Sequence, residues 1–162
     1  MKISDELNNK AINIALEKLK IKSTETRPNI VKTSIHWNTK LLRQISETNV
    51  RTHKGNISIK HDIDTGELLG WRYNDIKLSS HKIAISKEEA LDIAKKEITV
   101  PSDAILDSYE LINRGGIGYV YAVKWKHNIN NIEVDDDYII VKINPETKEV
   151  ISVTKNWSEI NE

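Results

Sequence analysis

The sequence predicts an α+β fold made of two copies of a helix-then-sheet unit. The segment Ile57–Trp71, ISIKHDIDTGELLGW, recurs in altered form at Tyr138–Val153, YIIVKINPETKEVISV. Each copy runs from an alternating strand through a polar turn into a second strand, and each follows an Ala-rich amphipathic segment. The threonines of the two turns, Thr65 and Thr147, lie 82 residues apart, and the two Ala-rich segments lie 79 apart. Two landmarks that agree this closely indicate a tandem duplication.

The two Ala-rich segments are the predicted helices. The first is expected to start at Ser4 as its N-cap and to run to about Lys20, with apolar residues at helical spacing on one side. The second opens on the capping box Ser86-Lys-Glu-Glu89, in which the serine hydroxyl accepts from the amide three residues on. Pro101 stops this helix, because proline has no amide hydrogen to continue the ladder.

After the second helix the apolar residues recur every second position, which predicts four antiparallel strands. Residues 113–118 contain three glycines and are predicted to form a hairpin turn, whereas residues 127–134 are predicted to form a polar loop. The four predicted strands are Leu106–Ile112, Tyr119–Lys126, Tyr138–Ile143 and Glu149–Thr154.

The first half gives a less regular pattern. Strands are predicted at Asn29–Trp37, 57–63 and 68–73, and residues 39–47 could form a short helix or a further strand. Gly66 is expected to have a positive φ in its turn, with Lys148 at the corresponding place in the second copy. Residues 74–82 are predicted to be a polar linker with Ser79 and Ser80 in the middle.

Composition excludes several classes of function. The 162 residues carry 24 basic and 24 acidic side chains, so the formal net charge is zero. Nucleic acid and anionic membranes require a basic excess, and neither is expected as a partner. The chain has no Cys, so no disulfide or thiolate metal site can form. We expect no transmembrane segment, and no signal peptide is apparent, so the protein is either cytosolic or exported by a segment outside this sequence.

The residues resemble the PepSY domain, a family related to the propeptides of thermolysin-like proteases. Its capped helix is matched by Ile85–Lys96, ISKEEALDIAKK, in the second copy. Its Asp-x-x-Thr-Gly-Glu-Val turn is matched by Asp62–Leu68 in the first copy, and less well by Asn144–Val150, where Lys148 replaces the glycine. Each copy keeps the motif that the other has lost, as expected of a decayed tandem.

The resemblance implies two cystatin-like units, each a helix packed on an antiparallel sheet of three to four strands. We assign residues 1–76 to a divergent first repeat and residues 83–162 to a second repeat. It also implies a non-catalytic role outside the cytoplasm, in which the chain binds or restrains a protein partner such as a peptidase or a cell-envelope protein. No cofactor is implied.

The predicted binding surface is the hairpin around Tyr119, Tyr121 and Trp125, whose large rigid rings suit partner contacts. The alternative is that these rings face the second helix and belong to the core. In the binding role, an extended segment of the partner is expected to pair with an open strand edge, where backbone hydrogen bonds provide affinity.

A different class of function stays open: a carrier of small molecules or lipids that uses the groove between helix and sheet. Three tryptophans could line such a groove, namely Trp71, Trp125 and Trp157.

No motif marks an enzyme. Residues 135–137, three consecutive aspartates, could bind Ca²⁺ but are expected to form a solvated turn. Asp62 and Asp64 could also bind a cation, but their carboxylates are expected to cap the turn that follows them. His61 is expected to be half-buried and hydrogen-bonded, and no metal site is predicted.

Overall fold

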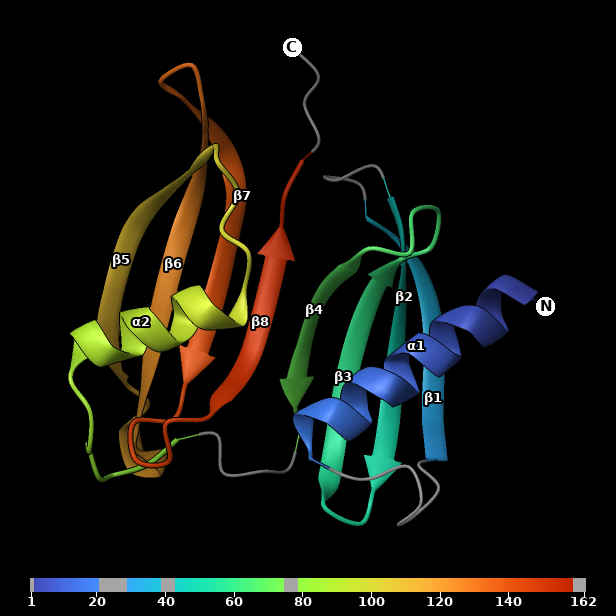
Figure 1. Ribbon diagram of the computed structural model, residues 1–162, viewed down its shortest axis with the longest axis horizontal. Coiled ribbons are helices and arrows are strands. Elements are labelled where there is room, and N and C mark those ends of the chain that lie inside the picture. Colours follow the sequence, from blue (N-terminus) through green and yellow to red (C-terminus); the bar gives the residue numbers. More distant parts are fainter. Residues whose placement is uncertain (1, 21–28, 39–42, 75–78, 159–162) are drawn as a thin grey trace. The chain divides into compact units, whose positions relative to one another are not determined.

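The computed structural model describes residues 2–20, 29–38, 43–74 and 79–158 of the chain (Figure 1). The chain divides into two compact units, Met1–Ile76 and Lys77–Glu162, called unit 1 and unit 2 below. The described elements of unit 1 are α1 (Lys2–Lys18), β1 (Asn29–Asn38), β2 (Arg43–Thr52), β3 (Gly55–Asp62) and β4 (Leu68–Tyr73). Those of unit 2 are α2 (Lys87–Glu97), β5 (Ala104–Asn113), the 3₁₀ turn η1 (Gly115–Ile117), β6 (Tyr119–Ile129), β7 (Ile132–Ile143) and β8 (Val150–Asn156).

The predicted fold class, two cystatin-like α+β units, is wrong. The structure is 53% strand and only 20% helix, so strands dominate it. The sequence pattern underestimated the strands, because it left residues 43–47 open between helix and strand and took residues 127–134 for a loop. The unit boundaries given above describe compactness alone, so the assignment of each unit to a PepSY-like repeat stays a prediction.

In unit 1, strands β1 to β4 pair antiparallel in chain order. The helix α1 lies across one face of these strands and contacts mainly β2 and β3 (Figure 1). Paired residues of antiparallel strands share a face, and the face under α1 is almost completely inaccessible. Its fully buried members include Val50, Ile57 and Ile59 from the strands. The helix α1 contributes Leu7, Ala11 and Ala15, and Leu19 follows directly after it.

In unit 2, strands β5, β6, β7 and β8 also pair antiparallel in chain order. The helix α2 contacts all four of them (Figure 1). Its buried residues Ala90 and Ala94 have small side chains, which let the helix approach the sheet closely. The predicted N-cap is confirmed, since the Glu89 amide donates to the Ser86 hydroxyl at 3.2 Å.

The hairpins β3–β4 and β7–β8 have the same register, displaced by 82 residues. Both contain a register shift at the same point, between Lys60 and His61 and between Lys142 and Ile143. A shared register and a shared irregularity indicate that the two hairpins are structural repeats of each other. The repeated pairs are Ile57–Tyr73, Ile59–Trp71 and His61–Leu68 in unit 1, and Ile139–Lys155, Val141–Val153 and Ile143–Val150 in unit 2.

Several boundaries differ from the predictions. Residues 127–134 are not a loop: β6 and β7 continue to a two-residue turn at Asn130 and Asn131, which both have positive φ, as such hairpins require. The helix α1 starts at Lys2, so Ser4 lies inside it. Residues 43–52 are strand, whereas residues 39–42 lie outside the described part. Ser79 and Ser80, predicted as linker, are buried in unit 2.

Candidate functional site

The three residues predicted to contact a partner lie on β6 of unit 2. Tyr121 and Trp125 belong to its core and are 5% and 2% exposed. The Tyr121 hydroxyl donates to the backbone carbonyl of Ile85 at 2.7 Å, and Tyr119 is half-buried. Two of the three side chains therefore fill the space between β6 and α2 in the structure, and the role of this set in binding stays a prediction.

Large apolar side chains are exposed on β1 instead. Ile35 is 60% exposed and Trp37 is 53% exposed. They pair with Ser46 and Gln44 of β2, and because alternate residues of a strand share a face, both lie on the face that α1 covers further along the sheet. We call this pair the β1 patch. An exposed apolar pair on an edge strand is typical of a surface that meets another protein.

In unit 2, the residue that corresponds to Ile35 is Leu111 of β5, and it is covered by the rest of the unit. Leu111 of β5 pairs with Tyr121 as Ile35 of β1 pairs with Ser46. Leu111 packs against the core of unit 2, since α2 contacts β5 whereas α1 contacts mainly β2 and β3. The large Tyr121 also supports its neighbour, and Ser46 offers no such support. The β1 patch is thus the uncovered counterpart of a core position.

The sequence contained a signal for the β1 patch, but the alternation of apolar residues did not show that this face is exposed. Ile35 and Trp37 stand two apart in a correctly predicted strand, which is the spacing of a core face. An apolar alternation predicts that a face is buried, but it does not say whether the chain itself or a partner buries it. The missing information was the span of α1, which depends on packing and is not encoded in the local pattern.

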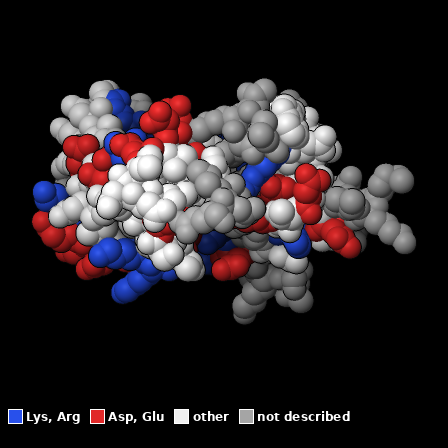
Figure 2. Space-filling view, turned by 90° about the horizontal axis from the view of Figure 1, so that it is seen from above, with Lys and Arg blue, Asp and Glu red and all other residues white. Residues whose placement is uncertain are grey.

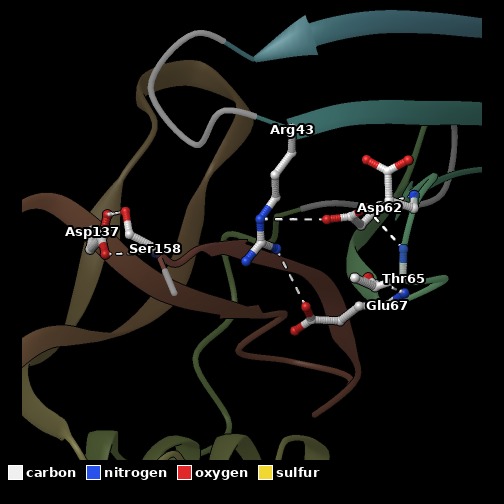
Figure 3. A network of polar contacts seen from close by, with 7 residues as sticks. Arg43, Asp62, Thr65, Glu67, Asp137 and Ser158 are labelled. Atoms are coloured by element: carbon white, nitrogen blue, oxygen red, sulfur yellow. Dashed lines mark hydrogen bonds and ion pairs between the residues drawn. The ribbon is translucent and has the colours of Figure 1, made fainter. Parts of the chain in front are cut away.

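The turns predicted from the duplicated motif have the same hydrogen bonds. In unit 1, the carboxylate of Asp62 accepts from the amides of Asp64 at 2.8 Å and Thr65 at 3.2 Å (Figure 3). In unit 2, the Asn144 side-chain oxygen accepts from the amides of Glu146 and Thr147 at 2.9 and 3.2 Å. These are Asx turns, in which a short polar side chain stands in for a backbone carbonyl.

Positive φ is confirmed at both predicted turn positions, with +75° at Gly66 and +67° at Lys148. In unit 1, Arg43 of β2 adds ion pairs to Asp62 and Glu67, each at 3.4 Å (Figure 3). The carboxylate of Asp62 is therefore held by an arginine and two amides. This arrangement stabilises the turn and matches the expectation that Asp62 has a structural role.

A buried polar cluster in unit 2 surrounds His127, which was predicted to lie in a solvated loop. Its Nδ1 lies 2.9 Å from Asp137 Oδ2 and its Nε2 lies 2.6 Å from Asp103 Oδ2. The ring stacks on Trp157, with centroids 4.0 Å apart. Asp137 also accepts from the amide and hydroxyl of Ser158 at 2.8 and 3.0 Å (Figure 3). The aspartate run is therefore partly structural, because Asp137 is buried and not solvated.

This cluster does not have the geometry of a hydrolase site. The hydroxyl of Ser158 donates to Asp137 and not to His127, so the imidazole has no nucleophile to activate. Both ring nitrogens face carboxylates, which leaves neither free to bind a metal. Within the described residues, no group of three or more His, Asp or Glu side chains is placed to hold a metal ion. No helix among them is long and apolar enough to cross a membrane.

The fold and these surfaces define a strand-rich protein with two similarly built units and an exposed apolar patch on an edge strand. Comparison with known families identifies it further: residues 8–157 match the family described as "YcdB, YcdC repeated domain". The chain belongs to this family, because the match covers nearly its whole length.

Two solved structures were compared with the chain. The Bacillus megaterium YpeB C-terminal domain is 14% identical, with a TM-score of 0.64 over 95% of this chain and 68% of that one. The two share a fold. A crystal structure described as a "putative lipoprotein" from Clostridium difficile 630 is 18% identical and covers 92% of each chain, but its TM-score of 0.29 is too low to indicate a shared fold. Among curated proteins, none matches the chain.

Proposed function

We propose that this chain is a non-catalytic protein-binding module, and that it binds its partner through the β1 patch. The observation that carries the proposal is the exposure of Ile35 and Trp37, at 60% and 53%, on the face that α1 covers elsewhere. Trp side chains are frequent centres of protein interfaces, because a large rigid ring buries much area at little entropic cost.

The geometry of the patch suits an extended segment of a partner. Among the described residues, β1 pairs only with β2, so its outer edge has backbone groups directed away from the sheet. A segment that pairs with this edge would form main-chain hydrogen bonds, and its side chains would lie against Ile35 and Trp37. The affinity would come from the backbone and the specificity from the two apolar side chains.

The PepSY resemblance supports the same proposal from the sequence. The capped helix of unit 2, residues 85–96, and the two turns at 62–68 and 144–150 carry it, and the two turns have the same positive φ position. We assign residues 1–76 and 83–162 to PepSY-like repeats on this basis. The resemblance also favours a site of action outside the cytoplasm and a peptidase or cell-envelope protein as the partner.

The alternative function, a carrier of small molecules, has less support. A carrier needs an apolar space between helix and sheet. In unit 2 that space contains Tyr121, Trp125 and Trp157, which pack together with Ala94 in one buried cluster. The tryptophans predicted to line a groove there are part of the core.

The proposal is tested by the affinity of the chain for a partner isolated from its host with the wild-type protein as bait. The double variant Ile35→Ser/Trp37→Ser removes the β1 patch and should weaken binding by about tenfold or more, as loss of an interface centre does. Its thermal unfolding should stay close to that of the wild type, since both side chains are exposed.

A matched control is available on the other unit. Ile132 lies beside the hairpin turn of β6 and β7 and is 69% exposed, so Ile132→Ser removes a similar apolar area from a different surface. This variant should bind as the wild type does. Equal affinity of the double variant and the wild type would contradict the proposal.

A further inference from the structure

His61 is a buried titratable group in the core of unit 1, and its counterpart in unit 2 is an isoleucine. The side chain is 2% exposed, and its Nδ1 has no hydrogen-bond partner among the described residues. It pairs with Ser46 of β2 and Leu68 of β4. The register places Ile143, which is fully buried, at the same position in unit 2.

A second unsatisfied atom lies on the same face. The hydroxyl of Thr48 is buried without a partner among the described residues, and Val123 has the corresponding place in unit 2. Unit 1 thus has Thr48 and His61 where unit 2 has Val123 and Ile143. Buried polar atoms without partners destabilise a core, so the two units differ in how firmly their helices are held.

The charged groups around His61 favour its neutral form. Lys10 of α1 extends over the β3–β4 turn, where its Nζ lies 2.9 Å from the position that a Cβ on Gly66 would take. Two carboxylates close to His61 in the chain, Asp62 and Glu67, are both paired with Arg43. Burial first, and then the charge of Lys10, lower the pKa of His61 below its usual value of 6.5.

The direction of the pH effect follows from this shift. Because the folded state binds a proton at His61 less readily than the unfolded state, stability rises with pH through the window below 6.5. Above that window the ring is neutral in both states and has no effect. As the pH falls through it, the unfolded or partly opened state takes up the proton and gains stability.

We propose that His61 makes the packing of α1 on unit 1 acid-sensitive, whereas unit 2 keeps α2 in place because Ile143 has no proton to gain. Acid would then open unit 1 alone and expose the apolar face formed by Val50, Ile57 and Ile59 together with the stripe on α1. This device is independent of whether the β1 patch binds a partner.

The test is amide hydrogen exchange of the full chain at pH 7.5, 6.5 and 5.5, expressed as protection factors so that the intrinsic pH dependence of exchange is removed. We expect α1 to lose protection between pH 6.5 and 5.5 while α2 keeps its own. Equal behaviour of the two helices would overturn the proposal.

Two variants separate His61 from other groups. His61→Leu should abolish the loss of protection in α1, because it supplies an apolar side chain as in unit 2. His53→Gln removes an exposed histidine of the same unit and should leave the loss unchanged. Persistence of the loss in His61→Leu would contradict the proposal.

An NMR titration of the wild-type ring keeps the proposal testable if a variant fails to fold. The His61 resonances should show no protonation near pH 6.5 while the protein stays folded. Titration at the ordinary value, with α1 still protected, would overturn it.

Discussion

Lys148 adopts a backbone conformation that glycine adopts more easily. Its φ of +67° matches the +75° of Gly66 in the other turn, and the Asx hydrogen bonds around both are the same. A β-carbon in this region is strained, whereas glycine is not. The second turn therefore keeps the conformation of the first although it has lost the residue best suited to it.

This difference predicts opposite effects of exchanging the two residues. Lys148→Gly should raise the free energy of unfolding by up to about 1 kcal/mol, and Gly66→Ala should lower it by about 1 kcal/mol or more. Both are measured by urea unfolding of the full chain. A destabilised Lys148→Gly variant would show that the lysine side chain contributes more than its backbone strain costs.

His127 is held by two aspartates whose environments differ. The Asp137 side chain is fully buried, whereas that of Asp103 is 40% exposed. Replacing the histidine would leave a buried carboxylate with fewer partners, so we expect His127→Asn to cost about 3 kcal/mol of stability. Urea unfolding measures this cost.

Asp103→Asn is the matched control for that change, since water can solvate the exposed partner. Its cost should be near 1 kcal/mol. If the two variants lose the same stability, the buried cluster is not what holds β6, β7 and the residues after β8 together.

At the scale of elements, the helix α2 depends on its cap. The Ser86 hydroxyl accepts from the Glu89 amide, so Ser86→Ala should lower the stability of unit 2 by about 1 kcal/mol, and Ser86→Gly by only a few tenths. Thermal unfolding, or exchange at the amides of α2, measures the difference. Equal losses in the two variants would mean that the hydroxyl has no capping role.

The sequence predicted elements well where local chemistry decides them. The cap at Ser86, both Asx turns and seven of the strands follow from short-range patterns, and the structure has them. The long hairpin of β6 and β7 was missed, because its turn uses Asn130 and Asn131 rather than glycine. Burial of His127 and Asp137 was also missed, since a polar side chain reveals no partner that is distant in sequence.

The predicted fold class was wrong for a related reason. Whether a strand edge is paired, and how far a helix reaches across a sheet, depend on packing between elements. Tyr121 and Trp125 lie on one face of their strand, and this spacing suits an exposed binding face as well as a buried core face. They belong to the core because α2 packs on that face. Ile35 and Trp37 have the same pattern and are exposed because α1 does not cover them.

At the scale of the whole molecule, the two units are built alike but suited to different roles. Unit 2 has an apolar core under a helix that contacts every one of its described strands. Unit 1 has two buried polar atoms that find no partner among the described residues, and an exposed apolar pair. Figure 2 shows acidic and basic side chains interspersed over the face in view, so no single-sign field directs a charged partner to it. The apolar patch is therefore the feature that we expect to determine binding.

Amide hydrogen exchange of the chain with and without its partner tests this claim most directly. The account predicts that the amides of residues 34–38 on β1 gain protection in the complex, while those around Ile132 on β7 do not change. Protection that appears elsewhere, with the amides of β1 exchanging as in the free chain, would contradict it.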